Sequence, residues 1–537
     1  MPGRSGLVSS GPQRSARAPI GSDFSRLGLD FGFQPEPSCL RLLGWRSGQE
    51  SLRWVPGSDA SGLETAQRRR SPPFPPAGFA DRQRLGNPLS FLSRRPIIAL
   101  FRYQIPMIPF TRRQALRTGL AAATGAVVQF GGIATLLGAG PAQAAPGKPE
   151  TTKVELGFIA LTDAAPLIIA KEKGFFLKQG MVGVELKKQT SWAVTRDNLE
   201  LGGARGGIDG AHILSPMPYL LTTGAITKSR QPVPMYVLAR LNLNGQAISA
   251  SNEFLKDKFS VTAPGLAKAV DRKNATGDKF KAAVTFPGGT HDLWMRYWLS
   301  ANGVDPNKKA DLVVIPPPQM VANMKSGTMD IFCVGEPWNE RLVNKKLGYT
   351  ALVTGQLWKN HPEKAFAMRA DWVKKNPNAT LRLLMAVQQA QKWADNPANT
   401  NELAKILAED KYVKASVEDL LPRLKGTIDF GTGKVANLPA LKMKFWADNA
   451  SFPYKSHDTW FVTEDIRWGY LPKGTNIKSL VNQVNRSDLW RAAAKANGYG
   501  AGPVGDSRGL EVFFDGTKFD SNNPQAYLNS LKIKALK

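Results

Sequence analysis

The sequence has 537 residues, with 71 Lys and Arg against 43 Asp and Glu, and a formal net charge of +28. Only two cysteines occur, and 42% of the residues are hydrophobic. This composition excludes a disulfide scaffold, a fibrous protein, a coiled coil and a polytopic membrane protein.

Residues 1–106 differ in composition from the rest of the chain. They are rich in Pro, Gly, Ser and Arg, and no lysine precedes Lys148. Such a segment is a poor candidate for a packed core. We expect it to be a disordered, non-native extension and the functional product to begin at Met107.

Residues 107–145 have the layout of a secretory signal: a basic start, a Gly- and Ala-rich apolar stretch, and a small-residue cleavage site at Ala142 and Ala144. The pair Arg112-Arg113 resembles the twin-arginine export signal. The alternative is an uncleaved anchor helix, although Gly and Ala dilute the hydrophobicity. No Cys stands directly after the cleavage site, so a lipid anchor is not expected. We expect the twin-arginine translocase to export a soluble protein to the periplasm.

Short apolar runs alternate with helical stretches from residue 153 onward. Strands are predicted at residues 153–161, 182–186, 235–240, 282–286, 311–315 and 329–334. Helices are predicted at residues 164–173, 379–394, 401–409 and 438–449. This alternation favours an α/β fold with parallel sheets and helices on both faces.

The exported part, of about 390 residues, suits two lobes of ordinary domain size. We expect residues 146–245 and 346–537 to form lobe 1, with a helical C-terminal region, and residues 246–345 to form lobe 2. Open sheets bind ligands at the carboxyl ends of their strands, so the ligand is expected in a cleft between the lobes.

Hydrogen-bond donors stand where strands give way to helices. Thr290 is predicted to cap the helix that carries His291 in its first turn. Gly335 precedes Pro337 and can present a backbone N–H at a helix start, which favours an anion. The alternative is that Gly335 only permits a tight turn. Asp163 is expected to cap the helix that begins at residue 164, and the alternative is that it lines the mouth of the cleft.

Motifs for nucleotide binding and serine hydrolysis do not occur: the sequence contains neither GxxxxGK[ST] nor GxSxG. The four His have no metal-ligand spacing, and a second nearby thiolate for zinc is missing. We therefore expect neither a cofactor nor a metal.

Several segments together resemble a known family. GFIALTDAAPLIIAKEKGFF, TSWAVTRDNLELG, LNLNGQAIS, VVIPPPQMVANMKSG, IFCVGEPWNERLV and WKNHPEKAFAMRADWVKKNPNAT look like segments of the nitrate and bicarbonate substrate-binding proteins of ABC importers. The resemblance covers roughly residues 150 to 500. It implies a two-lobed periplasmic binding protein of type II. It also implies a monomer that delivers its ligand to a membrane permease working with a cytoplasmic ATPase.

The resemblance also implies the ligand residues of a nitrate site, which are Trp192, Gln246, His291, Gly335 and Lys364. Nitrate is a planar monoanion whose three oxygens only accept hydrogen bonds, so a set of donors alone satisfies it. Indole, amide, imidazole, backbone N–H and ammonium are all donors.

Bicarbonate is the alternative ligand within the family, and it carries a hydroxyl that needs an acceptor. The bicarbonate-binding members place an acidic residue, associated with calcium, where this chain has Lys364, and an amide where it has His291. Both differences favour nitrate, with nitrite second.

Each residue also has a structural interpretation. Trp294 and Trp298, four apart on one helix face, are expected to be core aromatics. A single Lys such as Lys364 is usually a solvated surface charge. His212 and the remaining histidines are expected to be structural.

Two functions of other classes compete with transport. A Cys-dependent enzyme would use Cys333 with His291 as its base, although a Cys in an apolar strand usually behaves as a small buried hydrophobe. Nucleic-acid binding is suggested by the net charge, but the Lys residues are dispersed in short pairs and no basic stripe is visible. We expect no enzyme activity and no nucleic-acid partner.

Overall fold

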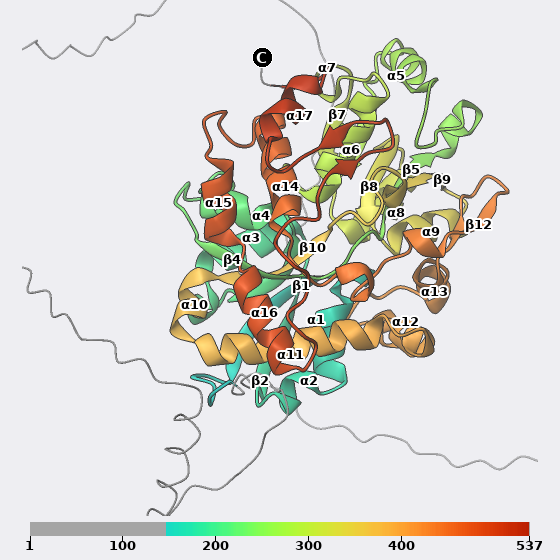
Figure 1. Ribbon diagram of the computed structural model, residues 1–537. Helices are drawn as coiled ribbons and strands as arrows, with labels where there is room; N and C mark the ends of the chain where they lie inside the picture. The colour runs from blue at the N-terminus through green and yellow to red at the C-terminus, as the bar shows by residue number, and fades with distance from the viewer. Residues whose placement is uncertain (1–145, 536–537) are drawn as a thin grey trace, which may run out of the picture. The chain divides into compact units, whose positions relative to one another are not determined.

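The computed structural model describes residues 146–535. Within this part, two five-stranded sheets are each flanked by helices (Figure 1). The predicted signal residues Arg112, Arg113, Ala142 and Ala144, and the extension before them, lie outside the described residues. Between residues 146 and 535, no helix combines the length and the apolar character needed to cross a membrane.

The first sheet, in lobe 1, has the strand order β2-β1-β3-β10-β4. β1 pairs in parallel with β2 and β3, whereas β10 runs antiparallel to β3 and β4. Its strands are β1 (Lys153–Ile159), β2 (Gly183–Gln189), β3 (Gly210–Leu214), β4 (Met235–Arg240) and β10 (Lys364–Arg369).

The second sheet, in lobe 2, has the order β7-β6-β8-β5-β9. β6 is parallel to β7 and β8, and β5 is antiparallel to β8 and β9. Its strands are β5 (Gln246–Ser251), β6 (Lys281–Val284), β7 (Asp311–Val314), β8 (Ile331–Gly335) and β9 (Gly348–Val353).

The prediction of parallel sheets is wrong for part of each sheet, because the chain crosses between the lobes twice. It leaves the first sheet after β4 and returns to it between β9 and β10. Each crossing enters the opposite sheet from the edge where the parallel strands end. β5 and β10 therefore run away from that edge, antiparallel to their neighbours.

Helices cover both sheets. Those of lobe 1 include α1 (Ala165–Glu172), α2 (Phe175–Lys178), α3 (Trp192–Leu201), α4 (Met217–Thr222), α10 (Ala370–Lys375), α11 (Pro377–Ala394), α12 (Thr400–Ala408), α15 (Ile477–Val484) and α16 (Ser487–Ala496). Those of the second lobe are α5 (Leu266–Asn274), α6 (Thr290–Ala301), α7 (Pro306–Lys309), α8 (Met320–Lys325) and α9 (Trp338–Asn344). The C-terminal part adds α13 (Val417–Lys425), α14 (Lys455–Trp468), α17 (Pro524–Ser530) and the hairpins β11 (Thr427–Asp429)–β12 (Val435–Asn437) and β13 (Glu511–Val512)–β14 (Lys518–Phe519).

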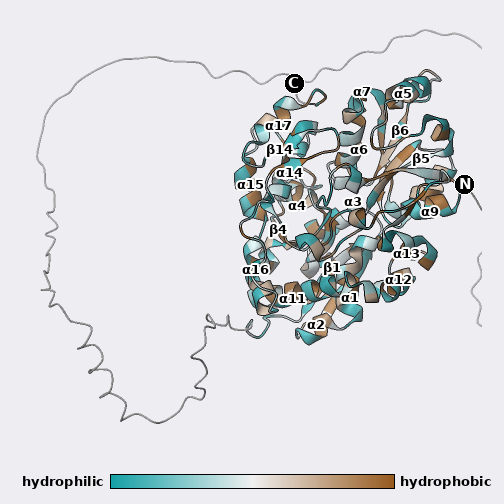
Figure 2. Ribbon diagram, turned by 45° about the vertical axis from the view of Figure 1, so that its right-hand side comes forward, coloured by the Kyte–Doolittle hydropathy of each residue, from teal (hydrophilic) through white to brown (hydrophobic). Residues whose placement is uncertain are grey.

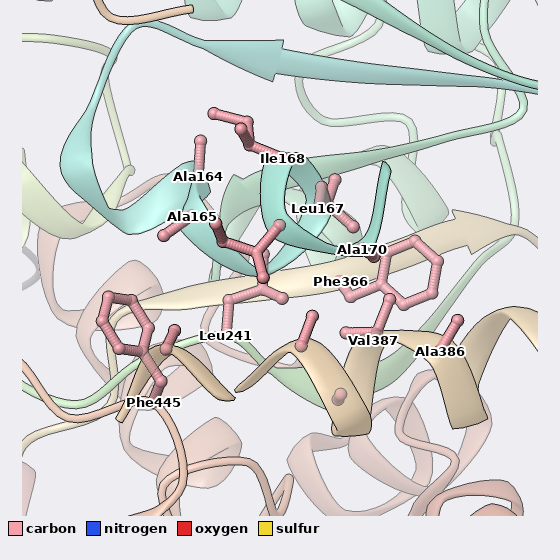
Figure 3. Close-up of a cluster of buried hydrophobic side chains, with 14 of the residues drawn as sticks. Ala164, Ala165, Leu167, Ile168, Ala170, Leu241, Phe366, Ala386, Val387 and Phe445 are labelled. Atoms are coloured by element: carbon pink, nitrogen blue, oxygen red, sulfur yellow. The ribbon is translucent and has the colours of Figure 1, made fainter. Parts of the chain in front are cut away.

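The hydrophobic core of lobe 1 surrounds α1, which lies between the first sheet and α11. Figure 3 shows Leu167 and Ala170 of α1 facing Phe366 of β10 and Val387 of α11. All six residues between Ala165 and Ala170 are buried, which explains why this helix reads as a continuous apolar run. Figure 2 shows hydrophilic residues on the outward faces of α15 and α16 and hydrophobic residues along the inner strands.

The C-terminal region packs against both lobes. In α14, Asp458 forms an ion pair of 2.6 Å with Arg240 of the first sheet. Two residues later, Trp460 stacks on Trp294 of lobe 2, with ring centroids 4.9 Å apart. The second sheet also includes β9, which lies beyond the expected boundary at residue 345. The segment 346–537 thus contributes to both lobes.

Two local predictions are wrong. The helix predicted at residues 438–449 is only two short 3-10 turns, because Lys444 instead exchanges backbone hydrogen bonds with Leu243 in the first crossing. Thr290 does not cap α6. Gly289 occupies the N-cap position, and the Thr290 hydroxyl bonds to the Glu363 carboxylate.

Candidate functional site

The two crossing segments place polar side chains at the boundary between the lobes. Gln246 is the first residue of β5, at the end of the first crossing, and Lys364 is the first residue of β10, at the end of the second. Both side chains are buried, at 1% and 0% exposure. Lys364 is therefore not a solvated surface lysine.

Gln246 connects residues of both lobes. Its amide Nε2 donates to Asp163 Oδ2 over 3.0 Å, and its Oε1 accepts from His291 Nε2 over 2.8 Å. The Thr285 hydroxyl contacts the other ring nitrogen of His291. The orientation of the Gln246 amide therefore places the hydrogen of His291 on Nε2.

Gly335 ends β8 directly opposite Gln246 in the sheet. A Cβ added at Gly335 would lie 2.6 Å from Gln246 Oε1 and 3.1 Å from Asp163 Oδ2. The absence of a side chain at Gly335 therefore permits close approach of the backbone to this cluster. This is a stronger reason for a glycine here than a tight turn.

Lys364 lies between two carboxylates. Its Nζ is 2.7 Å from Glu363 Oε1 and 3.0 Å from Asp163 Oδ2, and both carboxylates are fully buried. It is also 3.5 Å from His291 Nε2. The ammonium thus contacts residues reached from both lobes.

Trp192 begins α3, whose N-cap is Ser191. The indole is fully buried and packs on His212, with ring centroids 5.4 Å apart. His212 in turn contacts Asp163 Oδ1 over 2.6 Å. The Trp192 Nε1 has no hydrogen-bond partner among residues 146–535, and an unpaired buried N–H is costly.

The structure thus brings all five predicted ligand residues into one buried cluster. It also adds Glu363 and His212, to which the sequence interpretation assigned no role in binding, and Asp163, for which lining the cleft was the alternative to a helix cap. The expectation that Asp163 caps a helix is wrong, because its carboxylate contacts His212, Gln246 and Lys364 instead. Its place in the turn after β1 was the available signal, since ligand sites form at the carboxyl ends of strands. His212 offered no such signal.

Burial and charge together shift the pKa values of the cluster. Burial opposes ionisation of Asp163, but Lys364 and hydrogen bonds from His212 and Gln246 hold its pKa well below the usual range. Burial raises the pKa of Glu363, with Lys364 opposing it. Burial disfavours the charged form of Lys364, but Asp163 and Glu363 outweigh it and raise the pKa. Burial and the neighbouring Lys364 lower the pKa of His291 well below 6.5.

The carboxylate oxygens of the cluster already accept hydrogen bonds from protein donors. The donors are His212, Gln246 and Lys364 to Asp163, and Thr290, Trp294 and Lys364 to Glu363. These contacts occupy the carboxylate oxygens as acceptors. The donors that the cluster still offers to a ligand are the N–H groups that none of these contacts uses.

The chain is similar to known binding proteins. A family model described as the NMT1-like family matches residues 147–408. The nitrate/nitrite binding protein NrtA of Synechococcus elongatus is 68% identical over 390 residues, covering 72% of this chain and 88% of the relative. The bicarbonate-binding protein CmpA of the same organism is 45% identical over 405 residues, covering 73% and 90%.

A solved structure and a transporter subunit are also similar. The periplasmic nitrate-binding protein NrtA of Synechocystis is 56% identical, with a TM-score of 0.70, covering 72% of this chain and all of that one. The nitrate import ATP-binding protein NrtC of Synechocystis is 34% identical over 387 residues, covering 72% of this chain and 56% of NrtC. The chain belongs to the family of nitrate- and bicarbonate-binding proteins. The resemblance found in the sequence and the two-lobed periplasmic binding protein fold are both confirmed.

Membership in this family of binding proteins argues against the Cys-dependent enzyme, and so does the geometry. Cys333 lies inside β8 with no exposed surface. Burial raises the pKa of its thiol well above the usual range, which suppresses the nucleophilic thiolate. The side chain of His291 bonds to Thr285 and Gln246, so it is not placed as a base for this thiol.

Proposed function

We propose that the protein is the extracytoplasmic solute-binding component of an ABC importer and that it binds nitrate, with nitrite as a second ligand. The observation that carries this proposal is the unpartnered indole N–H of Trp192 in a fully buried cluster around Lys364. A monoanion with acceptor oxygens would satisfy that donor beside a positive charge.

Trp192, Gln246, His291, Gly335 and Lys364 are the proposed ligand residues. Counting hydrogens supports three of them directly. The Trp192 indole has its only N–H available. Gln246 uses one of its two amide hydrogens on Asp163. Lys364 uses two of its three on Asp163 and Glu363.

Bicarbonate is the second candidate, because CmpA shares 45% identity with this chain. Its hydroxyl would need a free acceptor, whereas the oxygens of Asp163 and Glu363 already accept from protein donors. The identity of 68% to a nitrate/nitrite binding protein also favours nitrate.

The binding cycle we propose is a closure of the two lobes around the anion. Trp192 and Lys364 belong to lobe 1, and Gln246, His291 and Gly335 to lobe 2. A ligand that contacts both sides stabilises the closed arrangement by contacts that an open one lacks. Direct contacts also join the lobes, since the Trp338 indole donates to the Ala160 carbonyl over 3.0 Å.

The closed protein would then dock as a monomer on a permease driven by a cytoplasmic ATPase. The similarity to part of NrtC, a nitrate import ATP-binding protein, supports a partner of this kind. We further propose export by the twin-arginine translocase and a periplasmic location without a lipid anchor.

Calorimetry of the purified protein with nitrate, nitrite, bicarbonate and sulfate tests the proposal. We expect nitrate to bind most tightly, nitrite next, and sulfate not at all, because a dianion would add two negative charges beside the two carboxylates that already face Lys364. Tighter binding of bicarbonate than of nitrate would contradict the assignment.

A further inference from the structure

The buried cluster carries more negative than positive charge. Asp163 and Glu363 face the single ammonium of Lys364, and none of the three has exposed surface. Burial also lowers the pKa values of His212, His291 and His361. With these imidazoles neutral, the cluster holds one net negative charge before any ligand enters.

A monoanion bound here would make the charge imbalance worse. Coulomb repulsion between like charges is strong where water is excluded, and a buried charge is costly unless it is compensated. Protein hydrogen-bond donors to the ligand lower this free-energy cost, but they do not remove the added negative charge. A cation that enters with the anion would remove it, and a proton is the smallest one.

We propose that nitrate binds together with one proton and that Nδ1 of His291 accepts it. This inference rests on the proposed function. The proton comes from the solvent, forms the N–H bond at Nδ1 and returns to solvent when nitrate leaves. No other bond forms or breaks.

The hydrogen bonds around His291 are suited to this change. Its Nε2 donates to Gln246 Oε1, because Asp163 accepts from the Gln246 amide nitrogen and so fixes the amide orientation. Nδ1 then carries the lone pair and faces the Thr285 hydroxyl. A hydroxyl can donate or accept. Rotation of the Thr285 hydroxyl would satisfy a new N–H without moving any heavy atom.

The other titratable groups of the cluster are less suited. His212 directs Nδ1 at the backbone N–H of Ile159, at 3.5 Å, and so cannot gain a hydrogen there. His361 bonds to Pro362 and Thr354 and to none of the proposed ligand side chains. Burial raises the pKa of Glu363, but both of its oxygens already accept hydrogen bonds, Oε1 from Thr290 and Lys364 and Oε2 from Trp294, so a proton there would displace a donor.

The groups that face His291 determine the direction of the pH dependence. Lys364 Nζ and Glu363 Oε1 lie 3.5 Å and 3.7 Å from its Nε2, and Asp163 reaches it through Gln246. The adjacent Asp292 is paired with Arg296. Burial and Lys364 keep His291 neutral at pH 7 without ligand, and a nearby anion raises the pKa. Between the free and bound pKa values, the nitrate Kd should rise about tenfold per pH unit.

Calorimetry of the full protein with nitrate at pH 7, in phosphate and in Tris, tests the inference. These buffers differ in ionisation enthalpy, so the dependence of the observed heat on the buffer counts the protons taken up. We expect uptake of about one proton per nitrate, as linkage requires for a group that titrates on binding. Tight nitrate binding with no proton uptake would overturn the inference and leave the proposed function standing. No nitrate binding in either buffer would overturn both.

Variants assign the proton to a residue. His291→Gln should bind nitrate more weakly and, at nitrate concentrations that still saturate it, with uptake near zero. Thr285→Val should reduce the uptake, because Nδ1–H would have no acceptor. His457→Gln is the matched control: this buried histidine lies beside Glu511 and Arg508, away from the cluster, and uptake should persist. Undiminished uptake in His291→Gln would overturn the assignment. If that variant fails to fold, Thr285→Val decides between the same outcomes.

Discussion

Asp163 and Lys364 form an ion pair at the edge of the first sheet that faces lobe 2, with Oδ2 and Nζ 3.0 Å apart and neither side chain exposed. The pair has two consequences. It keeps a fully buried lysine charged, and together with Glu363 it leaves one ammonium hydrogen of that lysine without a carboxylate partner. Removing Lys364 leaves the buried charges of Asp163 and Glu363 uncompensated, which typically costs about 3–5 kcal/mol of stability.

Lys364→Ala should weaken nitrate binding about tenfold to a hundredfold, because a charge-assisted hydrogen bond contributes about 1.5–3 kcal/mol. Lys364→Glu should nearly abolish it by adding a third carboxylate, and bicarbonate should suffer less, since its hydroxyl can donate to that carboxylate. Calorimetry and denaturant unfolding measure both effects. Lys308→Ala is the control, because that side chain is 81% exposed. Unchanged nitrate affinity in Lys364→Glu would remove the main support for nitrate over bicarbonate.

Gly335→Ala should weaken nitrate binding by roughly tenfold or more, because a new methyl group 2.6 Å from Gln246 Oε1 must displace that amide, and small misplacements of binding groups are costly. The matched control is Gly265→Ala, where an added Cβ meets nothing within 4 Å. Titration of both variants with nitrate gives the comparison. Equal affinities would show that the close approach at Gly335 is unimportant for the ligand.

Trp192→Phe should lower nitrate affinity roughly tenfold through loss of one hydrogen bond to an anion. Its free energy of unfolding should fall only by the cost of the cavity that the smaller ring leaves, because the indole N–H has no protein partner to lose. Trp298→Phe provides the contrast: that buried indole also donates to the Ser260 carbonyl, so stability should fall further while nitrate affinity stays. A destabilised Trp192→Phe with normal affinity would make Trp192 a core residue only.

Replacing Arg112 and Arg113 together by Lys should trap the precursor inside the cell, because the twin-arginine translocase recognises that pair. Cell fractionation followed by N-terminal sequencing of the exported protein measures this. Cleavage is expected after Ala144 or nearby. Normal export of the double variant would exclude the twin-arginine route.

The sequence by itself determined the class of fold and the five proposed ligand residues. Strands such as Met235–Arg240 and helices such as Pro377–Ala394 were predictable because their burial follows local apolar runs. The motifs around Gln246, Gly335 and Lys364 were identifiable through family resemblance, since each is a short contiguous segment.

Only the tertiary structure decided how these residues meet and what surrounds them. β5 and β10 run antiparallel to their neighbours because of the two crossings. The helix predicted around Lys444 does not form, because the backbone of Lys444 pairs with that of Leu243. Neither follows from local propensity, because each depends on partners far along the chain. Asp163 and Glu363 likewise belong to the cluster only because the fold buries them beside Lys364. The net charge of a buried site depends on all the charged groups that the fold brings together there.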